Sequence, residues 1–152
     1  MANSYTQLYI HLVFAVKGRA SLITKGHREE LHKYITGIIK NNDCKLLAIN
    51  SMPDHIHILL SLHPKIAISD LVRDIKSNSS AFIKEKGWSS LFAWQEGFGA
   101  FSYSHSQIGD VIRYIENQVE HHTKRGFQEE YKEFLKRFQV AFDERYLFVP
   151  AE

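Results

Sequence analysis

Two histidines separated by one residue, His55 and His57, are the residues of this sequence best suited to chemistry. They stand in the segment MPDHIHILLSL, where a Pro-Asp turn leads into a strictly alternating stretch. In an extended strand, side chains at i and i+2 lie about 7 Å apart on one face, so two imidazoles can bind one small cation. Ile56 and Ile58 would anchor the strand in the core. The segment predicts half of a metal site, although two unrelated half-buried histidines would give the same pattern.

A second candidate group lies on a helix expected over residues 107–125. At about 100° per residue, Tyr114 and Gln118 share one helical face, and His121 falls beside them. Taken alone, Tyr114 would be interpreted as an ordinary surface tyrosine. Its alignment with the amide of Gln118 and the imidazole of His121 favours a shared role. The apolar stripe lies roughly 60–160° away and consists of Ile108, Val111, Ile112, Ile115 and Val119.

A metal beside a tyrosine indicates phosphodiester chemistry. A phenol has a pKa of about 10 and is a poor nucleophile unless its electrophile is activated. A divalent metal held by His55 and His57 can polarise a phosphodiester, and the carbonyl oxygen of Gln118 is a reasonable third ligand. This set of nitrogen and oxygen ligands suits Mn²⁺ and, less well, Mg²⁺. The single cysteine, Cys44, excludes a disulfide or a cysteine-based zinc site within one chain.

The elements that position these residues follow from the hydrophobic period, which is two in strands and near 3.6 in helices. The order β-α-β-β-α-β predicts an α+β, ferredoxin-like fold, with an antiparallel four-stranded sheet, two helices on one face and added C-terminal helices. The first and third strands are central neighbours in this topology, so His11 could share a face with the histidine pair. The expected strands cover 6–16, 45–51, 55–62 and 93–104, and the expected helices 25–42, 69–87, 107–125 and 128–138.

Length and composition fit one globular domain over residues 1–152, with a core over about 5–125 and a C-terminal helical segment and arm over 126–152. A net charge of +2 and a pI near 8.6 permit a nucleic-acid partner without requiring one. The N-terminus shows no signal-peptide pattern, and no apolar run approaches the ~20 residues that span a bilayer. A cytoplasmic protein is therefore expected.

Four segments in this order, YIHLVFAVKGR, MPDHIHILL, WQEGFGAFSYS and YIENQVEHH, resemble the HUH single-tyrosine transposases of minimal bacterial insertion sequences. The chain also resembles the REP-associated tyrosine transposases. The resemblance covers about residues 5–125. It implies Tyr114 as the nucleophile and His55, His57 and Gln118 as metal ligands.

The resemblance further implies a metal-dependent enzyme that cuts and rejoins single-stranded DNA at element ends through a 5′-phosphotyrosine intermediate. Its partners would be DNA hairpins near those ends and a second subunit, in a homodimer with active sites shared between subunits. No membrane partner is expected. Four aromatic residues are candidates for stacking unpaired bases, although two of them, Trp94 and Phe98, fit packing in the core or in a dimer better; the other two are Trp88 and Tyr103. Candidates for the metal's surroundings or for DNA contacts, each equally readable as a polar surface or sheet residue, are His11, Asn117, His121, His122, Lys17, Arg19, Lys76, Lys84 and Arg113.

Two other functions compete with this hypothesis. A non-catalytic, single-stranded nucleic-acid-binding module of RNA-recognition-like fold would expose aromatic and basic residues on its central strands, which His55 and His57 fit poorly. A histidine phosphoesterase of the two-motif type would need a second His-x-Ser/Thr motif. The segments that start at His11 and His105 both lack it. A metal-dependent DNA strand transferase is the function that the sequence favours.

Overall fold

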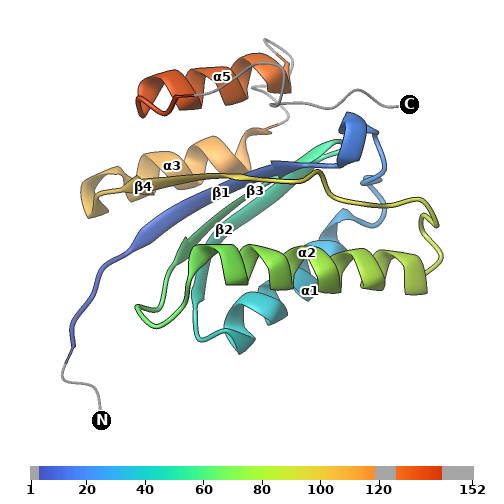
Figure 1. The fold of residues 1–152 in the computed structure, drawn as a ribbon, viewed down its shortest axis with the longest axis horizontal. Helices are drawn as coiled ribbons and strands as arrows, with labels where there is room; N and C mark the ends of the chain where they lie inside the picture. The colour runs from blue at the N-terminus through green and yellow to red at the C-terminus, as the bar shows by residue number, and fades with distance from the viewer. Residues whose placement is uncertain (1–3, 119–125, 142–152) are drawn as a thin grey trace.

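The centre of the protein is a four-stranded antiparallel sheet in the order β2-β3-β1-β4 (Figure 1). The structure is a computed structural model and describes residues 4–118 and 126–141. β1 and β3 are central neighbours and are buried along nearly their whole length. The predicted α+β sheet and its strand order are confirmed. The strands are β1 (Tyr9–Ala15), β2 (Lys45–Met52), β3 (His55–Ser61) and β4 (Gly99–Tyr103).

Helices cover both faces of this sheet (Figure 1). α1 (Arg28–Asn41) and α2 (Ile68–Glu85) lie on one face, and α3 (Ile108–Glu116) and α5 (Phe127–Arg137) lie on the other. Two short 3-10 helices, η1 (Lys17–Arg19) and η2 (His105–Gln107), follow β1 and β4. In the described part of the chain, no helix is long and apolar enough to span a bilayer.

Strict alternation along β1 and β3 divides the sheet into two chemically different faces. The even-numbered side chains, such as Leu12, Phe14 and Ile58, enter the apolar core under α1 and α2. Because successive residues of a strand point to opposite faces, the odd-numbered ones, His11 and His57 among them, point toward α3 and α5. The apolar face anchors the strands and fixes the register of the histidines.

Two elements are much shorter in the structure than predicted, whereas the others differ only by a few residues at their ends. Only Gly99–Tyr103 of the segment 93–104 joins the sheet as a regular strand, because Gly97 has a φ of 82° and the side chain of Gln95 accepts the Ala15 N–H at 2.8 Å. Trp94 contributes a single bridge to Val16. α3 ends at Glu116, and residues 119–125 of the predicted helix lie outside the described residues.

The two helices over the histidine face are each fixed by a specific contact. Asn50 of β2 donates its side-chain N–H to the carbonyl of Ile115 at 2.9 Å, which attaches the end of α3 to the sheet. α5 packs its Tyr131 ring against Gly99 of β4, where a Cβ would lie only 2.8 Å from the ring carbon Cε1. The glycine lets α5 approach the sheet closely.

Candidate metal and tyrosine site

The two histidines of β3 are fully buried, and each ring is held at its Nδ1 atom. His55 Nδ1–H donates to a carboxylate oxygen of Asp54 at 2.7 Å. His57 Nδ1 forms a 2.8 Å hydrogen bond with His11 Nε2. Such contacts fix the orientation and tautomer of an imidazole and leave the opposite nitrogen for a ligand. Both rings are therefore prepared to bind through Nε2.

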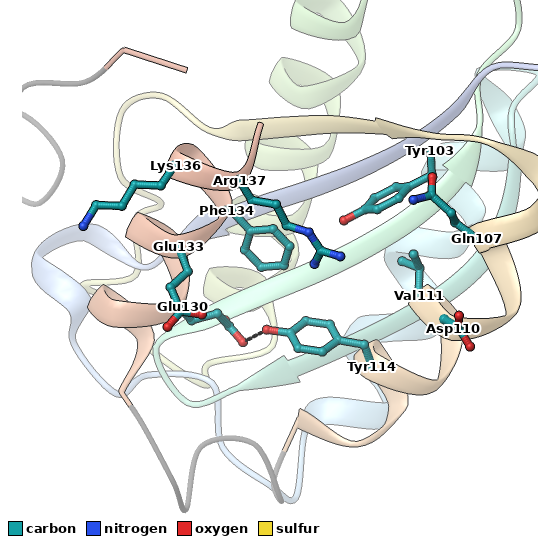
Figure 2. A pocket seen from close by; sticks show the side chains of 10 residues that line it. All are labelled: Tyr103, Gln107, Asp110, Val111, Tyr114, Glu130, Glu133, Phe134, Lys136 and Arg137. Atoms are coloured by element: carbon teal, nitrogen blue, oxygen red, sulfur yellow. Dashed lines mark hydrogen bonds between the residues drawn. The ribbon is translucent and has the colours of Figure 1, made fainter. Parts of the chain in front are cut away.

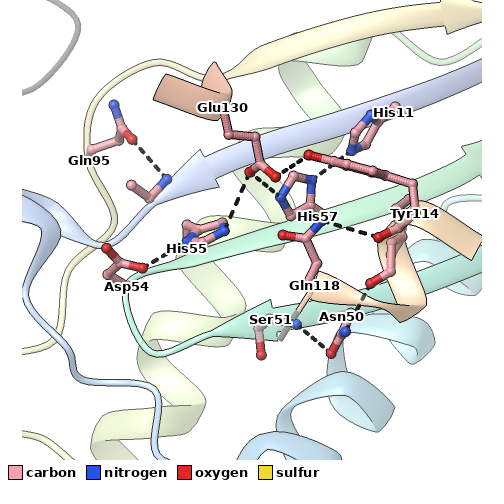
Figure 3. A network of polar contacts seen from close by, with 12 residues as sticks. His11, Asn50, Ser51, Asp54, His55, His57, Gln95, Tyr114, Gln118 and Glu130 are labelled. Atoms are coloured by element: carbon pink, nitrogen blue, oxygen red, sulfur yellow. Dashed lines mark hydrogen bonds and ion pairs between the residues drawn. The ribbon is translucent and has the colours of Figure 1, made fainter. Parts of the chain in front are cut away.

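A glutamate from α5 meets both Nε2 atoms (Figure 3). Glu130 is 1% exposed, and its Oε1 lies 3.0 Å from His57 Nε2 and 3.7 Å from His55 Nε2. The three residues offer ligand atoms that all lie within 4.8 Å of one another. The hydroxyl of Tyr114 donates a hydrogen bond to the second carboxylate oxygen, Oε2. One buried carboxylate thus connects the histidine pair to the tyrosine.

α3 brings Tyr114 and Gln118 to this group within the same chain. The half-buried Tyr114 ring lies edge-on to His57, with 6.0 Å between ring centroids. Gln118 is fully buried, and its amide nitrogen donates to the Tyr114 carbonyl at 3.3 Å. That contact uses the nitrogen end of the amide, whereas the oxygen end has the chemistry of a metal ligand. The structure therefore gathers the predicted nucleophile and the predicted ligands in one place.

The site combines buried imidazoles with two carboxylates, those of Asp54 and Glu130. Burial, together with the nearby His57, lowers the pKa of His11 well below its ordinary value, so this ring is neutral. Burial alone would raise the pKa of Asp54, but the hydrogen bond and charge of His55 hold it below its ordinary value. The Glu130 carboxylate is buried beside these imidazoles, and a buried carboxylate is costly unless a positive charge balances it. The two nitrogens and one oxygen therefore fit a divalent metal such as Mn²⁺.

Comparison with known proteins places the chain in a family. The family model "Transposase IS200 like" matches residues 4–118. The chain belongs to the IS200-like transposases. Among curated relatives, the ISDra2 transposase TnpA of Deinococcus radiodurans is 30% identical over 119 residues, which cover 74% of this chain and 84% of the relative.

Two solved structures resemble this transposase in fold. One is a crystal structure from Deinococcus radiodurans R1, with a TM-score of 0.59 and 26% identity over 78% of this chain and 95% of that one. The other is a REP-associated tyrosine transposase bound to a REP hairpin, with a TM-score of 0.57 and 18% identity over 80% of this chain and 73% of that one. The family match includes His55, His57, Tyr114 and Gln118 but ends before α5.

The remaining candidates of the sequence analysis are spread around the transposase. His11 lies in the site through its contact with His57, and Arg19 of η1 lies near enough to Asp54 to affect its pKa. Lys17 shares η1 with Arg19. Arg113 pairs with Asp110 on the exposed side of α3. Asn117 is exposed just after that helix.

Two candidate lysines lie on the opposite side of the sheet, and two histidines are not described. Lys76 and Lys84 are on α2, away from the histidine face (Figure 1). Lys76 Nζ donates to the carbonyls of Gln95 and Gly97 at 2.9 and 2.5 Å. Burial lowers the pKa of Lys76 to about 8. His121 and His122 lie outside the described residues.

Asp54 and Glu130 were not among the sequence-based candidates for the site, and Glu130 is the more informative omission. Two adjacent acidic residues, Glu129 and Glu130, open α5 and read as a solvated first turn. A signal was nevertheless present, because Glu130 follows Phe127 by three positions and precedes Phe134 by four, which places it on the apolar stripe. A carboxylate on a buried helix face needs a partner, although the helical period alone does not say which residues it meets.

A pocket of about 440 Å³ opens beside Tyr114, between α3 and η2 on one side and α5 on the other (Figure 2). Tyr103 and Phe134 supply aromatic walls, and the exposed Arg137 supplies positive charge. Tyr114 and Glu130 line its inner end. The half-buried tyrosine is thus reachable from the pocket, while the histidines behind it are enclosed.

Proposed function

We propose that this transposase cuts and rejoins single-stranded DNA at the ends of an insertion sequence, with Tyr114 as the nucleophile. One observation carries the proposal: the Tyr114 hydroxyl and the His55–His57 pair meet at a single buried carboxylate. A phenol held beside a metal-binding group is suited to attack an activated phosphodiester. The family supports DNA as the class of substrate.

His55, His57 and Gln118 would hold a divalent ion, Mn²⁺ or Mg²⁺, through two imidazole nitrogens and an amide oxygen. When bound, the ion would polarise the scissile phosphate and stabilise the charge that develops on it. Asp54 and His11 hold the imidazoles in the orientation this requires. The hydrogen bond from Asn50 to the Ile115 carbonyl holds α3, and with it the Tyr114 phenol, close to the histidine pair.

The cleavage step exchanges one phosphoester bond for another. The Tyr114 oxygen attacks phosphorus and loses its proton, the bond from phosphorus to the 3′ oxygen breaks, and the departing 3′ oxygen takes up a proton. A 5′-phosphotyrosine link and a free 3′-hydroxyl result. Because the link conserves the energy of the broken bond, a second 3′-hydroxyl can displace the tyrosine and reseal the strand without ATP.

The pocket beside Tyr114 is the proposed path of the strand next to the scissile phosphate. Arg137 can pair with a phosphate, and the Tyr103 ring can stack an unpaired base. A DNA hairpin is the proposed element that positions this strand, by analogy with the hairpin-bound structural relative. The competing RNA-recognition-like function is not favoured, because α3 and α5 bury the face of β1 and β3 that it would use.

A homodimer with active sites shared between subunits stays a prediction, and the geometry of one chain supports assembly within each subunit. Mixing Tyr114→Phe protein with His57→Ala protein separates the two arrangements. Sites assembled within one chain predict that the mixture stays inactive. Sites shared between subunits predict that cleavage returns in the fraction of mixed dimers that pair an intact tyrosine with an intact histidine pair.

Covalent trapping tests the proposed chemistry. The full chain is incubated with Mn²⁺ or Mg²⁺ and hairpin-containing single-stranded DNA, and the products are resolved on a denaturing gel. We expect a protein–DNA adduct that Tyr114→Phe abolishes, and His57→Ala should abolish cleavage while retaining most DNA binding. An adduct that survives Tyr114→Phe would refute the assignment of the nucleophile. Cleavage that survives His57→Ala would refute the role of the metal.

A further inference from the structure

We propose that Glu130 of α5 is an oxygen ligand of the metal and also holds the Tyr114 hydroxyl, which makes α5 part of the active site. The inference rests on the proposed function, because it assigns a further residue to the same metal. It concerns a helix outside the residues that match the family model, which end at Gln118. The assignment therefore depends on this chain's own geometry.

The two carboxylate oxygens of Glu130 have different partners. Oε1 lies 3.0 Å from His57 Nε2 and 3.7 Å from His55 Nε2, and Oε2 accepts the hydrogen bond of Tyr114. A cation held by both Nε2 atoms would lie next to Oε1, while Oε2 could keep the phenol. Carboxylate oxygen is also the ligand that Mn²⁺ and Mg²⁺ prefer over an amide oxygen. One side chain can thus bring the nucleophile and the metal together.

The position of Glu130 is built into the packing of α5. Phe127, Tyr131 and Phe134 bury the same helix face against the sheet and the histidines. Gly99 leaves the space that the Tyr131 ring occupies, so the helix lies close enough for a glutamate to reach β3. A buried carboxylate costs free energy, and apolar contacts on both sides in the same helix hold it in place. This arrangement indicates a functional use for the charge.

The same contacts also allow the opposite role for Glu130, in which its carboxylate competes with the metal for the two imidazoles. If the carboxylate only occupied the place of the metal, its removal would free both imidazoles and would tighten metal binding. If it is a ligand, its removal takes away a charged oxygen and weakens binding. The sign of the change in Mn²⁺ affinity therefore separates the two roles.

The first experiment measures Mn²⁺ binding by calorimetry and by the electron paramagnetic resonance signal of free Mn²⁺. Glu130→Gln should raise the Kd about tenfold or more, by comparison with the effect of groups that only orient a ligand. Glu129→Gln is the matched control, because it removes the same charge from an exposed neighbour on α5 and should leave the Kd unchanged. An unchanged or lower Kd for Glu130→Gln would overturn the proposal. Thermal unfolding without metal confirms that each variant is folded.

A second experiment detects the change in the ligands of the metal directly. Co²⁺ shows visible d–d bands whose position and intensity depend on the ligands around it, so Glu130→Gln should change the bands of bound Co²⁺. Glu129→Gln, on the exposed neighbour, should leave them unchanged. If Co²⁺ bound to Glu130→Gln gives the bands of the unaltered protein, Glu130 is not a ligand.

A third comparison separates failure of this inference from failure of the proposed function. His57→Ala should lose Mn²⁺ binding whether or not Glu130 is a ligand. If His57→Ala loses binding and Glu130→Gln does not, the metal site stands and the role of Glu130 is refuted. If His57→Ala binds Mn²⁺ as well as the unaltered protein, the proposed function itself fails.

Discussion

Replacing Asp54 by asparagine tests whether the orientation of His55 sets the affinity for metal. The Asp54 carboxylate accepts the His55 Nδ1–H at 2.7 Å, and its side chain is 24% exposed. A hydrogen bond to a charged group is worth about 1.5–3 kcal/mol, and one to a neutral amide about 0.5–1.5 kcal/mol. The loss is about 1–1.5 kcal/mol, or about tenfold in an equilibrium constant. We therefore expect the Kd for Mn²⁺ to rise about tenfold.

The assay measures cleavage of hairpin DNA across a series of Mn²⁺ concentrations, together with direct Mn²⁺ binding. Asp54→Asn should shift the half-maximal Mn²⁺ concentration upward and reach nearly the unaltered rate at saturation, because Tyr114 and Glu130 keep their contact. Asp43→Asn is the control, since Asp43 is exposed and pairs with Lys65 at 2.7 Å. Equal metal curves for Asp54→Asn and the unaltered protein would refute the reasoning. A rate that stays low at saturating Mn²⁺ would show that Asp54 acts on the phosphate chemistry and not on metal affinity.

Three further outcomes follow from particular contacts. Burial, with the charge of Arg28, lowers the pKa of His32 from 6.5 to about 4, so the unfolded chain binds the proton more readily between these pH values. The free energy of unfolding should therefore fall by about 1–2 kcal/mol from pH 7 to pH 5, after allowance for solvent screening. Urea titration of His32→Gln at the two pH values should show a smaller fall. Gly99→Ala should lower the free energy of unfolding by about 1–3 kcal/mol and weaken Mn²⁺ binding, because the Tyr131 ring must shift. Gly37→Ala is the control and should not destabilise the protein, since no atom lies within 4 Å of its added Cβ. Equal stability of the two variants would contradict the close packing of α5 on β4. Arg137→Ala should weaken binding of single-stranded DNA and leave the Mn²⁺ affinity unchanged. The slope of log K for DNA against log salt concentration should decrease in magnitude by about one. A slope equal to that of the unaltered protein would show that Arg137 does not contact the DNA.

The sequence predicted the sheet because its strands carry a complete local signal. Alternation along β1 and β3 fixes which residues face the core, and the Pro-Asp turn fixes β2 and β3 as neighbours. The helical phase of Tyr114 and Gln118 likewise predicted their common face. Periodicity could not show that α5 folds back over the histidines, because that depends on a long-range fit between Tyr131 and Gly99. The segment 93–104 was overestimated as a strand because a positive φ at Gly97 is not visible in an alternation pattern.

The burial pattern also limits the direction from which a substrate could reach the site on the proposed function. His55, His57 and Glu130 are at most 1% exposed, so a phosphate cannot approach them through the sheet or through α5. Tyr114 is half-buried and lines a pocket that also contains Arg137 and Tyr103. A phosphate entering there meets the phenol before it meets the histidines. On the proposed function, the strand would therefore reach Tyr114 from this pocket, with His55, His57 and Glu130 enclosed on the far side of the phenol.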